Sequence, residues 1–263
     1  MGELLRTIRA LAHCWRAEFS AASEYRADLI SGTFVSAIWL AVSVAPLLVV
    51  STHTSAAGWT RPRLLLLSAV WYLLDAVVWM IIGNNSARLD ERVRDGSLDA
   101  VLLQPVNSLL MCSLRHLYVQ DVPKVALAIL LGGYAVASGG GPATIVSGMA
   151  ALVTIACACV LMWAAGVLSS YKSLSAVRFD GWRVMTGVHD LARIPTPLYG
   201  TTLHLLLTVV LPVSFLTTVP AQVFFGDIPL WWAGLSLALA TAVVSLTAGL
   251  WRRELRRYTG AMS

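Results

Sequence analysis

Apolar residues gather along the chain in long, nearly uninterrupted blocks, with shorter polar segments between them. A helix needs about 20 apolar residues to cross the roughly 30 Å hydrocarbon core of a membrane. The blocks therefore predict an all-α membrane protein. Six transmembrane helices are expected, at residues 29–50, 64–82, 122–137, 143–168, 201–219 and 229–251.

The segment before the first block, residues 1–28, has a helical rather than a continuous apolar pattern. Its large apolar residues recur every three or four positions, at Leu4, Ile8, Leu11, Trp15 and Phe19. Such spacing predicts an amphipathic helix that lies on the membrane surface. The alternative is a helix packed on the protein's own cytoplasmic side, and both arrangements can hold at once.

Composition supports the membrane assignment. Of the 263 residues, 57% are hydrophobic and 13% are charged, whereas about a quarter of the residues in a soluble domain are charged. The high hydrophobicity also excludes an intrinsically disordered chain.

Basic residues indicate the orientation. With a cytoplasmic N-terminus, all but two of the 19 lysines and arginines fall on the cytoplasmic side, the exceptions being Arg61 and Arg63. Positive charge gathers on that side of membrane proteins. Both termini are therefore expected in the cytoplasm, in the cell inner membrane. Because topology explains the net charge of +5, no nucleic-acid partner is expected.

Two long connections are expected in the cytoplasm, at residues 83–121 and 169–200, and the outer loops are short. One outer segment is unusual, since residues 215–226 are rich in aromatic residues and contain a proline. This pattern predicts a short re-entrant helix between spans five and six, carrying Phe215, Pro220, Phe224 and Phe225.

The first cytoplasmic connection contains the clearest local signal. A charged helix ends at Gly96, a short apolar helix follows, and Pro105 ends it. An exposed apolar element of this kind between two spans predicts a docking site for another protein. The alternative is an interfacial loop that only joins the spans.

Known catalytic patterns are absent from the sequence. It has no H-E-x-x-H, no G-x-S-x-G and no glycine-rich loop that would hold a nucleotide phosphate. Neither catalytic nor metal-binding residues are expected, so this chain does not hydrolyse ATP by itself. An intramembrane enzyme stays the alternative, and His204 is the only histidine expected inside a span.

Asp75 is the only acidic residue expected well inside a span, and Trp71 and Trp79 lie four residues to either side of it. A carboxylate at this depth needs a partner, a proton or a water-filled cavity. Between two indole rings it fits an organic cation, so these residues form a hypothetical substrate path. The alternatives are a structural bond to another span and a protonated, packed side chain.

Trp231, Trp232 and Trp251 lie near the ends of the last expected span. Tryptophan is enriched at membrane interfaces. We interpret these three residues as interface anchors.

Three segments resemble permease subunits of bacterial type-2 ABC exporters. They are "DGSLDAVLLQPVNSL" after the second span, "ARIPTPLYG" before the fifth, and "LPVSFLTTVPAQVFFG" after it. The closest similarity is to the branch with a cytoplasmic G-x-L-D-x-x-L-x-x-P motif. Gln104 differs from that branch, which usually has a basic residue before the proline.

The resemblance implies one permease domain over residues 1–263 that pairs with a second permease, identical or homologous, and with two separate ATPase subunits. ATP and magnesium would be bound by the ATPase, and this chain would bind no cofactor. The docking element on the ATPase would be the coupling segment 83–121, through Gly96, Leu98, Asp99, Leu103 and Pro105. The expected cargo is an amphipathic drug-like, lipid-like or cationic compound. A self-contained secondary carrier is the other alternative, although the sequence has no convincing internal repeat.

Overall fold

The structure is a computed structural model that describes residues 2–24, 26–53, 58–95, 97–139, 141–171 and 181–256. The elements of these residues are all helical. In chain order the larger ones are α1 (Gly2–Glu24), α2 (Arg26–His53), α3 (Arg61–Val77), the π-helix η2 (Val78–Gly83), α4 (Asn84–Asp95), α5 (Leu98–Leu102), α6 (Ser108–Leu114), α7 (Val122–Ala137), α8 (Ile145–Tyr171), α9 (Gly181–Leu191), α10 (Thr201–Val209), α11 (Thr218–Phe225) and α12 (Trp231–Leu255). Three short 3₁₀ turns join them: η3 (Val119–Asp121), η5 (Thr196–Tyr199) and η6 (Val213–Phe215).

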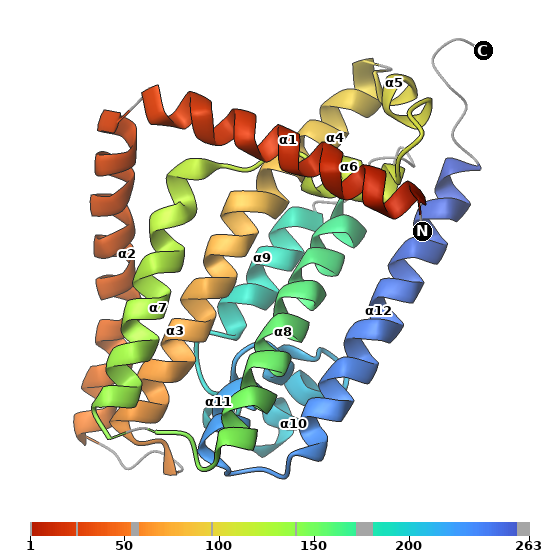
Figure 1. The fold of residues 1–263 in the computed structure, drawn as a ribbon. Helices are drawn as coiled ribbons and strands as arrows, with labels where there is room; N and C mark the ends of the chain where they lie inside the picture. The colour runs from red at the N-terminus through yellow and green to blue at the C-terminus, as the bar shows by residue number, and fades with distance from the viewer. Residues whose placement is uncertain are drawn as a thin grey trace.

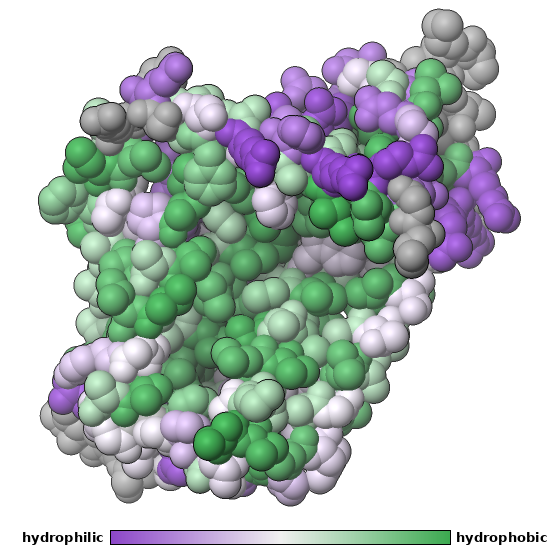
Figure 2. All heavy atoms as spheres, in the orientation of Figure 1, coloured by the Kyte–Doolittle hydropathy of each residue, from purple (hydrophilic) through white to green (hydrophobic). Residues whose placement is uncertain are grey.

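The long helices form an upright bundle with two different ends (Figure 1). At one end α1 lies across the bundle, beside α4, α5 and α6; we call this the α1 end. The opposite end holds α10 and α11, and we call it the α11 end. Hydrophilic residues gather at the α1 end, while most of the visible side of the bundle is hydrophobic (Figure 2). This distribution is typical of a protein whose sides face lipid.

Five helical segments of the described residues are long and apolar enough to cross a membrane. They are Ala27–Val49, Arg61–Leu89, Val119–Ala137, Ile145–Ser170 and Trp231–Leu255. These segments overlap five of the six expected spans. The second runs without interruption from α3 through η2 into α4, so one continuous helix reaches from the bundle to the α1 end.

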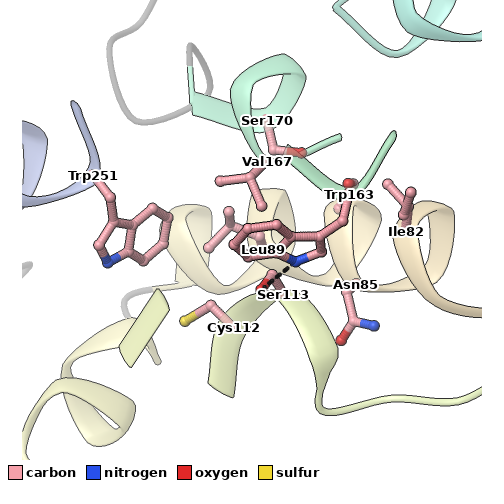
Figure 3. A pocket seen from close by; sticks show the side chains of 10 residues that line it. Ile82, Asn85, Leu89, Cys112, Ser113, Trp163, Val167, Ser170 and Trp251 are labelled. Atoms are coloured by element: carbon pink, nitrogen blue, oxygen red, sulfur yellow. Dashed lines mark hydrogen bonds between the residues drawn. The ribbon is translucent and has the colours of Figure 1, made fainter. Parts of the chain in front are cut away.

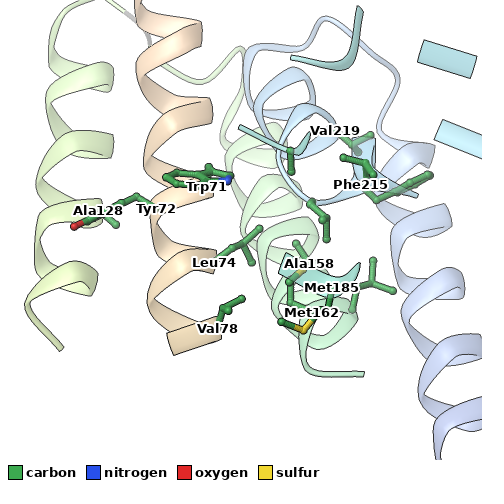
Figure 4. Packing of buried hydrophobic residues seen from close by; sticks show 14 of the residues in the cluster. Trp71, Tyr72, Leu74, Val78, Ala128, Ala158, Met162, Met185, Phe215 and Val219 are labelled. Atoms are coloured by element: carbon green, nitrogen blue, oxygen red, sulfur yellow. The ribbon is translucent and has the colours of Figure 1, made fainter. Parts of the chain in front are cut away.

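The central helix of the bundle is α3. In the segment that contains α3, 72% of the apolar stretch is buried inside the protein; the share is 17% in the segments that contain α7 and α12. The side chains Trp71, Tyr72 and Leu74 of α3, and Val78 at the start of η2, pack toward α7 on one side and toward α8, α9 and α11 on the other (Figure 4). The spans α2, α7 and α8 pack on α3, and α12 packs on α8.

The expected fifth span, residues 201–219, is not one helix. α10 ends at Val209, and Pro212 precedes the turn η6 and the separate helix α11. Proline has no backbone N–H to continue a helix. Hydroxyl groups at this break bond to the backbone of the segment that follows α9. Thr217 Oγ1 donates to the Ala192 carbonyl at 2.6 Å, and Thr218 Oγ1 accepts from the Thr196 N–H at 3.2 Å.

The expected cytoplasmic connection 169–200 is corrected in part, because α9 lies inside the bundle. The Trp182 ring lies 5.6 Å from that of Trp79, and the His189 ring stacks on Trp71 at 4.9 Å. Trp71 and Trp79 both belong to the candidate span Arg61–Leu89. Polar residues made this segment look extramembrane, but here they contact partners on other helices. Arg193, which follows α9, therefore lies among the helices, in contact with α2 and with Trp71 of α3.

Candidate functional site

The α1 end carries a compact module made of α4, α5 and α6, with α1 packed across it (Figure 1). Leu98 and Val101 of α5 are buried with Leu109 of α6 and Leu11 of α1 in one apolar cluster. This cluster fixes the short helix α5, which is too short to be stable by itself.

The tip of the module projects an apolar side chain. The Leu103 side chain is 86% exposed, and Gln104 and Pro105 beside it are also exposed. Of the other residues expected in the docking element, Leu98 is fully buried, Asp99 is half-buried, and Gly96 lies outside the described residues. The structure therefore divides the expected element into an anchor at Leu98 and an exposed surface at Leu103 and Pro105.

Specific bonds hold α1 on this module. Thr7 Oγ1 accepts from the Asn107 N–H at 2.9 Å, and Trp15 Nε1 donates to the Leu114 carbonyl at 2.8 Å. Another stripe of α1, which includes Ile8, stays about half exposed. One face of α1 thus packs on the protein, and a second apolar face is free for the membrane surface, so both expected arrangements fit the helix.

The bundle anchors α6 through two tryptophans (Figure 3). Trp163 of α8 donates to Ser113 Oγ at 3.0 Å, and Trp251 of α12 donates to Ser108 Oγ at 3.2 Å. Only about 10 Å³ of free space is left between these side chains, which is barely room for one water molecule. Trp251 is 3% exposed, so its interpretation as an interface anchor is corrected: it is a packing residue of the module.

His116 connects three parts of the α1 end. Its Nε2 lies 3.2 Å from the Arg92 guanidinium, and its Nδ1 lies 3.1 Å from Glu18 of α1. A guanidinium only donates, so Nε2 accepts and Nδ1 carries the proton of a neutral ring. Burial, together with Arg88 and Arg92, lowers the pKa of His116 against the opposing effect of Glu18.

Asp75 lies in the middle of the candidate span and is bonded on both oxygens. Its Oδ2 accepts from Lys124 Nζ of α7 at 3.0 Å, and its Oδ1 accepts from Trp79 Nε1 at 3.1 Å. Lys124 also lies 2.9 Å from Asp121. This geometry corresponds to the alternative of a structural bond to another span, while a role for Asp75 toward substrate stays a prediction.

Trp71 has other partners than Asp75. Its Nε1 donates to the His189 carbonyl at 3.0 Å, and the Arg193 guanidinium lies over its ring at 5.5 Å. Arg193 also donates to the backbone carbonyls of Val42 and Ser43 in α2, at 3.0 and 3.3 Å. Trp71 is thus part of an α2–α3–α9 contact, separate from the Asp75 cluster.

The residues expected in the re-entrant helix surround and form α11. Phe215 and Pro220 are buried, and Phe224 and Phe225 are half-buried. The Phe224 carbonyl accepts from the Ala143 N–H at 3.1 Å, which fixes α11 against the connection between α7 and α8. The structure shows a short packed helix here, and its re-entry into the membrane stays a prediction.

The family model described as ABC-2 family transporter protein matches residues 37–262, which is most of the chain. The chain belongs to the ABC-2 transporter family. Comparison with curated proteins and with solved structures gives no match. This ABC-2 protein is therefore a multi-pass membrane component of a transporter, and the matched region includes the α4–α6 module, Asp75 and α11.

Sequence reasoning missed several residues that organise this ABC-2 protein. Trp163 is an ordinary member of an apolar block, Trp251 was interpreted as an interface anchor, and His116 lies in a connection without a motif. Arg193 lies in the segment "ARIPTPLYG", whose pattern does not indicate its partners. The one available signal was the spacing of His189 and Arg193. They are four positions apart, which places them on one side of a helix if the helix extends that far. Their partners come from distant parts of the chain, and no local pattern identifies them.

Proposed function

We propose that this ABC-2 protein is the permease subunit of an ATP-driven exporter and docks on its ATPase through the tip of α5. The observation that carries the proposal is the exposed Leu103–Pro105 tip on a module that is otherwise tightly packed. Leu103 is 86% exposed, and it lies in the segment that the resemblance to type-2 ABC exporters identifies as the docking element.

The connection from this tip to the bundle supports the proposal. Helix α4 continues through η2 into the buried helix α3 without a loop. A π-helix inside a span frequently occurs at a functional position. A displacement of α5 would therefore reach the central helix directly, and alternating access needs such a mechanical link between the ATPase and the spans.

The proposal includes the expected assembly. Two ATPase subunits bind ATP and magnesium, a second permease, identical or homologous, completes the membrane part, and the α1 end faces the cytoplasm of a cell whose inner membrane holds the complex. The cargo is an amphipathic compound of drug-like, lipid-like or cationic character.

Co-purification tests the proposal. The tagged chain is purified in mild detergent from its native host, and mass spectrometry identifies what stays bound. We expect a Walker-motif ATPase with the wild type and at least a tenfold smaller yield of it with Leu103→Ser. Ile145→Ser is the matched control, because Ile145 is 83% exposed but lies at the α11 end.

Recovery of the chain without an ATPase, at every nucleotide condition, would contradict the exporter and favour a self-contained carrier. Equal recovery with Leu103→Ser would contradict the assignment of the docking tip alone.

A further inference from the structure

A groove runs along one side of α2. Its other lining residues come from η2 and from the segment that contains η3 and the start of α7. Its volume is about 730 Å³, within the range of sites that enclose drug-sized molecules. It begins near Asp28, in the first turn of α2, and extends to Trp39, eleven positions further along the helix. The first turn of α2 lies at the α1 end (Figure 1), so the lining residues of α2 extend from that end toward the middle of the bundle.

Three aromatic side chains line the groove and remain uncovered by the protein. Trp39 of α2, Trp79 of η2 and Tyr118 are 47%, 46% and 45% exposed. They come from three separate segments, so the fold and not the sequence brings them together. Aromatic faces attract organic cations as well as apolar groups.

The charges around the groove favour a cation. Asp28 and Asp121 line it, and Asp75 lies behind Lys124. Lys124 is the one cation among the described lining residues, and both Asp75 and Asp121 bind its ammonium. Two carboxylates therefore share one ammonium, and Asp28 adds a third carboxylate that forms no ion pair within the described part of the chain.

We propose that this groove binds an amphipathic organic cation, with the positive group between Asp28 and Asp121 and the apolar body against Trp39 and Trp79. The inference rests on the proposed function, because it names the class of compound that the exporter takes. It also replaces Asp75 as the recognition residue: the Asp75 side chain is 4% exposed behind Lys124 and does not line the groove, whereas Asp28 is exposed and lines it.

Binding of tetraphenylphosphonium to the full-length protein in phosphatidylglycerol nanodiscs tests the proposal by equilibrium dialysis. Tetraphenylborate, of the same shape and opposite charge, is the matched probe. We expect nanodiscs that contain the protein to bind the phosphonium ion at least tenfold more tightly than empty nanodiscs do. The borate ion should bind equally to nanodiscs with and without the protein. Equal retention of both ions would overturn the proposal.

Variants locate the binding. We expect Asp28→Asn to weaken phosphonium binding roughly fivefold, as for loss of one solvent-exposed charge contact, and Trp39→Leu to weaken it about two- to fivefold. The controls are Asp227→Asn, which removes an exposed carboxylate that pairs with Arg63, and Trp231→Leu, which removes a 60% exposed tryptophan. A folded Asp28→Asn protein with wild-type affinity, or equal losses in the controls, would overturn the proposal.

A lipid ammonium headgroup and a free amphipathic cation share this chemistry. Added phosphatidylcholine that competes with the phosphonium ion in the wild type would identify the lipid, and absence of competition would identify the free cation. Because binding is measured without an ATPase, the two proposals fail separately. Binding without any ATPase partner would contradict the exporter alone, and an ATPase partner without binding would contradict the groove alone.

Discussion

The ion pair between Asp75 and Lys124 predicts unequal effects of single and double substitutions. Their side chains are only 4% and 12% exposed, and removal of one partner leaves a buried charge. We expect Asp75→Asn to lower the free energy of unfolding by about 3 kcal/mol. Asp75→Asn/Lys124→Gln should recover at least half of that loss, because it also removes the buried ammonium that Asp75→Asn leaves with Asp121 as its remaining carboxylate partner.

Denaturation of the purified protein in detergent, followed by intrinsic fluorescence, measures both values. Additive losses in the double variant would show that the pair is not coupled. Unchanged export of an organic cation by folded Asp75→Asn protein would end the hypothesis that Asp75 contacts the substrate.

The environment of His116 predicts a pH-dependent α1 end. Its pKa is lowered from 6.5 in the folded protein, so on acidification the unfolded chain takes up the proton first. Stability from this residue is therefore present above the unfolded pKa and is lost as the pH falls below about 6.5.

We expect the melting temperature to fall between about pH 7.5 and pH 5.5, and to fall less in His116→Asn. His13→Asn, on the exposed side of α1, is the control and should keep the wild-type profile. An unchanged profile in His116→Asn would contradict this interpretation.

At the scale of the elements, a helix defect in α2 explains the position of Arg193. Pro46 lies inside α2 and has no N–H, so the carbonyl of Val42, four residues earlier, loses its helical partner. The Arg193 guanidinium donates to that carbonyl from outside the helix. In a membrane such groups must find a partner within the protein, and the proline thereby fixes the segment after α9 to α2.

Arg193→Gln should cost about 1.5–3 kcal/mol of unfolding free energy, the range for a charged hydrogen bond. The cost should shrink in a Pro46→Ala background, where the alanine restores the helical N–H and Val42 needs no other donor. A double-mutant cycle by thermal denaturation measures the coupling, with Arg9→Gln on the exposed side of α1 as the control. Equal cost in both backgrounds would refute the connection.

Across the whole molecule, the continuous helix from α3 to α4 depends on close packing against α8. A Cβ at Gly166 of α8 would lie 2.0 Å from Cγ2 of Ile82 in η2. We expect Gly166→Ala to lower the unfolding free energy by about 1–3 kcal/mol through overpacking. Gly133→Ala in α7 is the control, since nothing lies within 4 Å of its Cβ.

Thermal melting of both variants tests this contact. Gly166→Ala should cost less in an Ile82→Ala background than in the wild type, because the clashing methyl group is gone. Loss of the same size in Gly133→Ala would mean that the effect is not specific to the α8–η2 contact.

Properties that act along the chain were predictable from the sequence. Apolar blocks of sufficient length gave five segments that the structure shows as long helices, and the spacing of Leu4 to Phe19 gave α1. Stop signals around Pro105 predicted the end of the short apolar helix and so the exposed tip at Leu103, because proline has no N–H to continue a helix and so short a helix has few other bonds to carry it past one.

Partners from distant segments were decided only by the tertiary structure. The cost of a polar side chain in a membrane depends on what it meets there, so Arg193 and His189 looked extramembrane until α2 and α3 supplied their contacts. Asp75 looked open to substrate until α7 supplied Lys124. The groove at Trp39 has the same origin: its charges and rings come from three segments, and only their packing makes a single site.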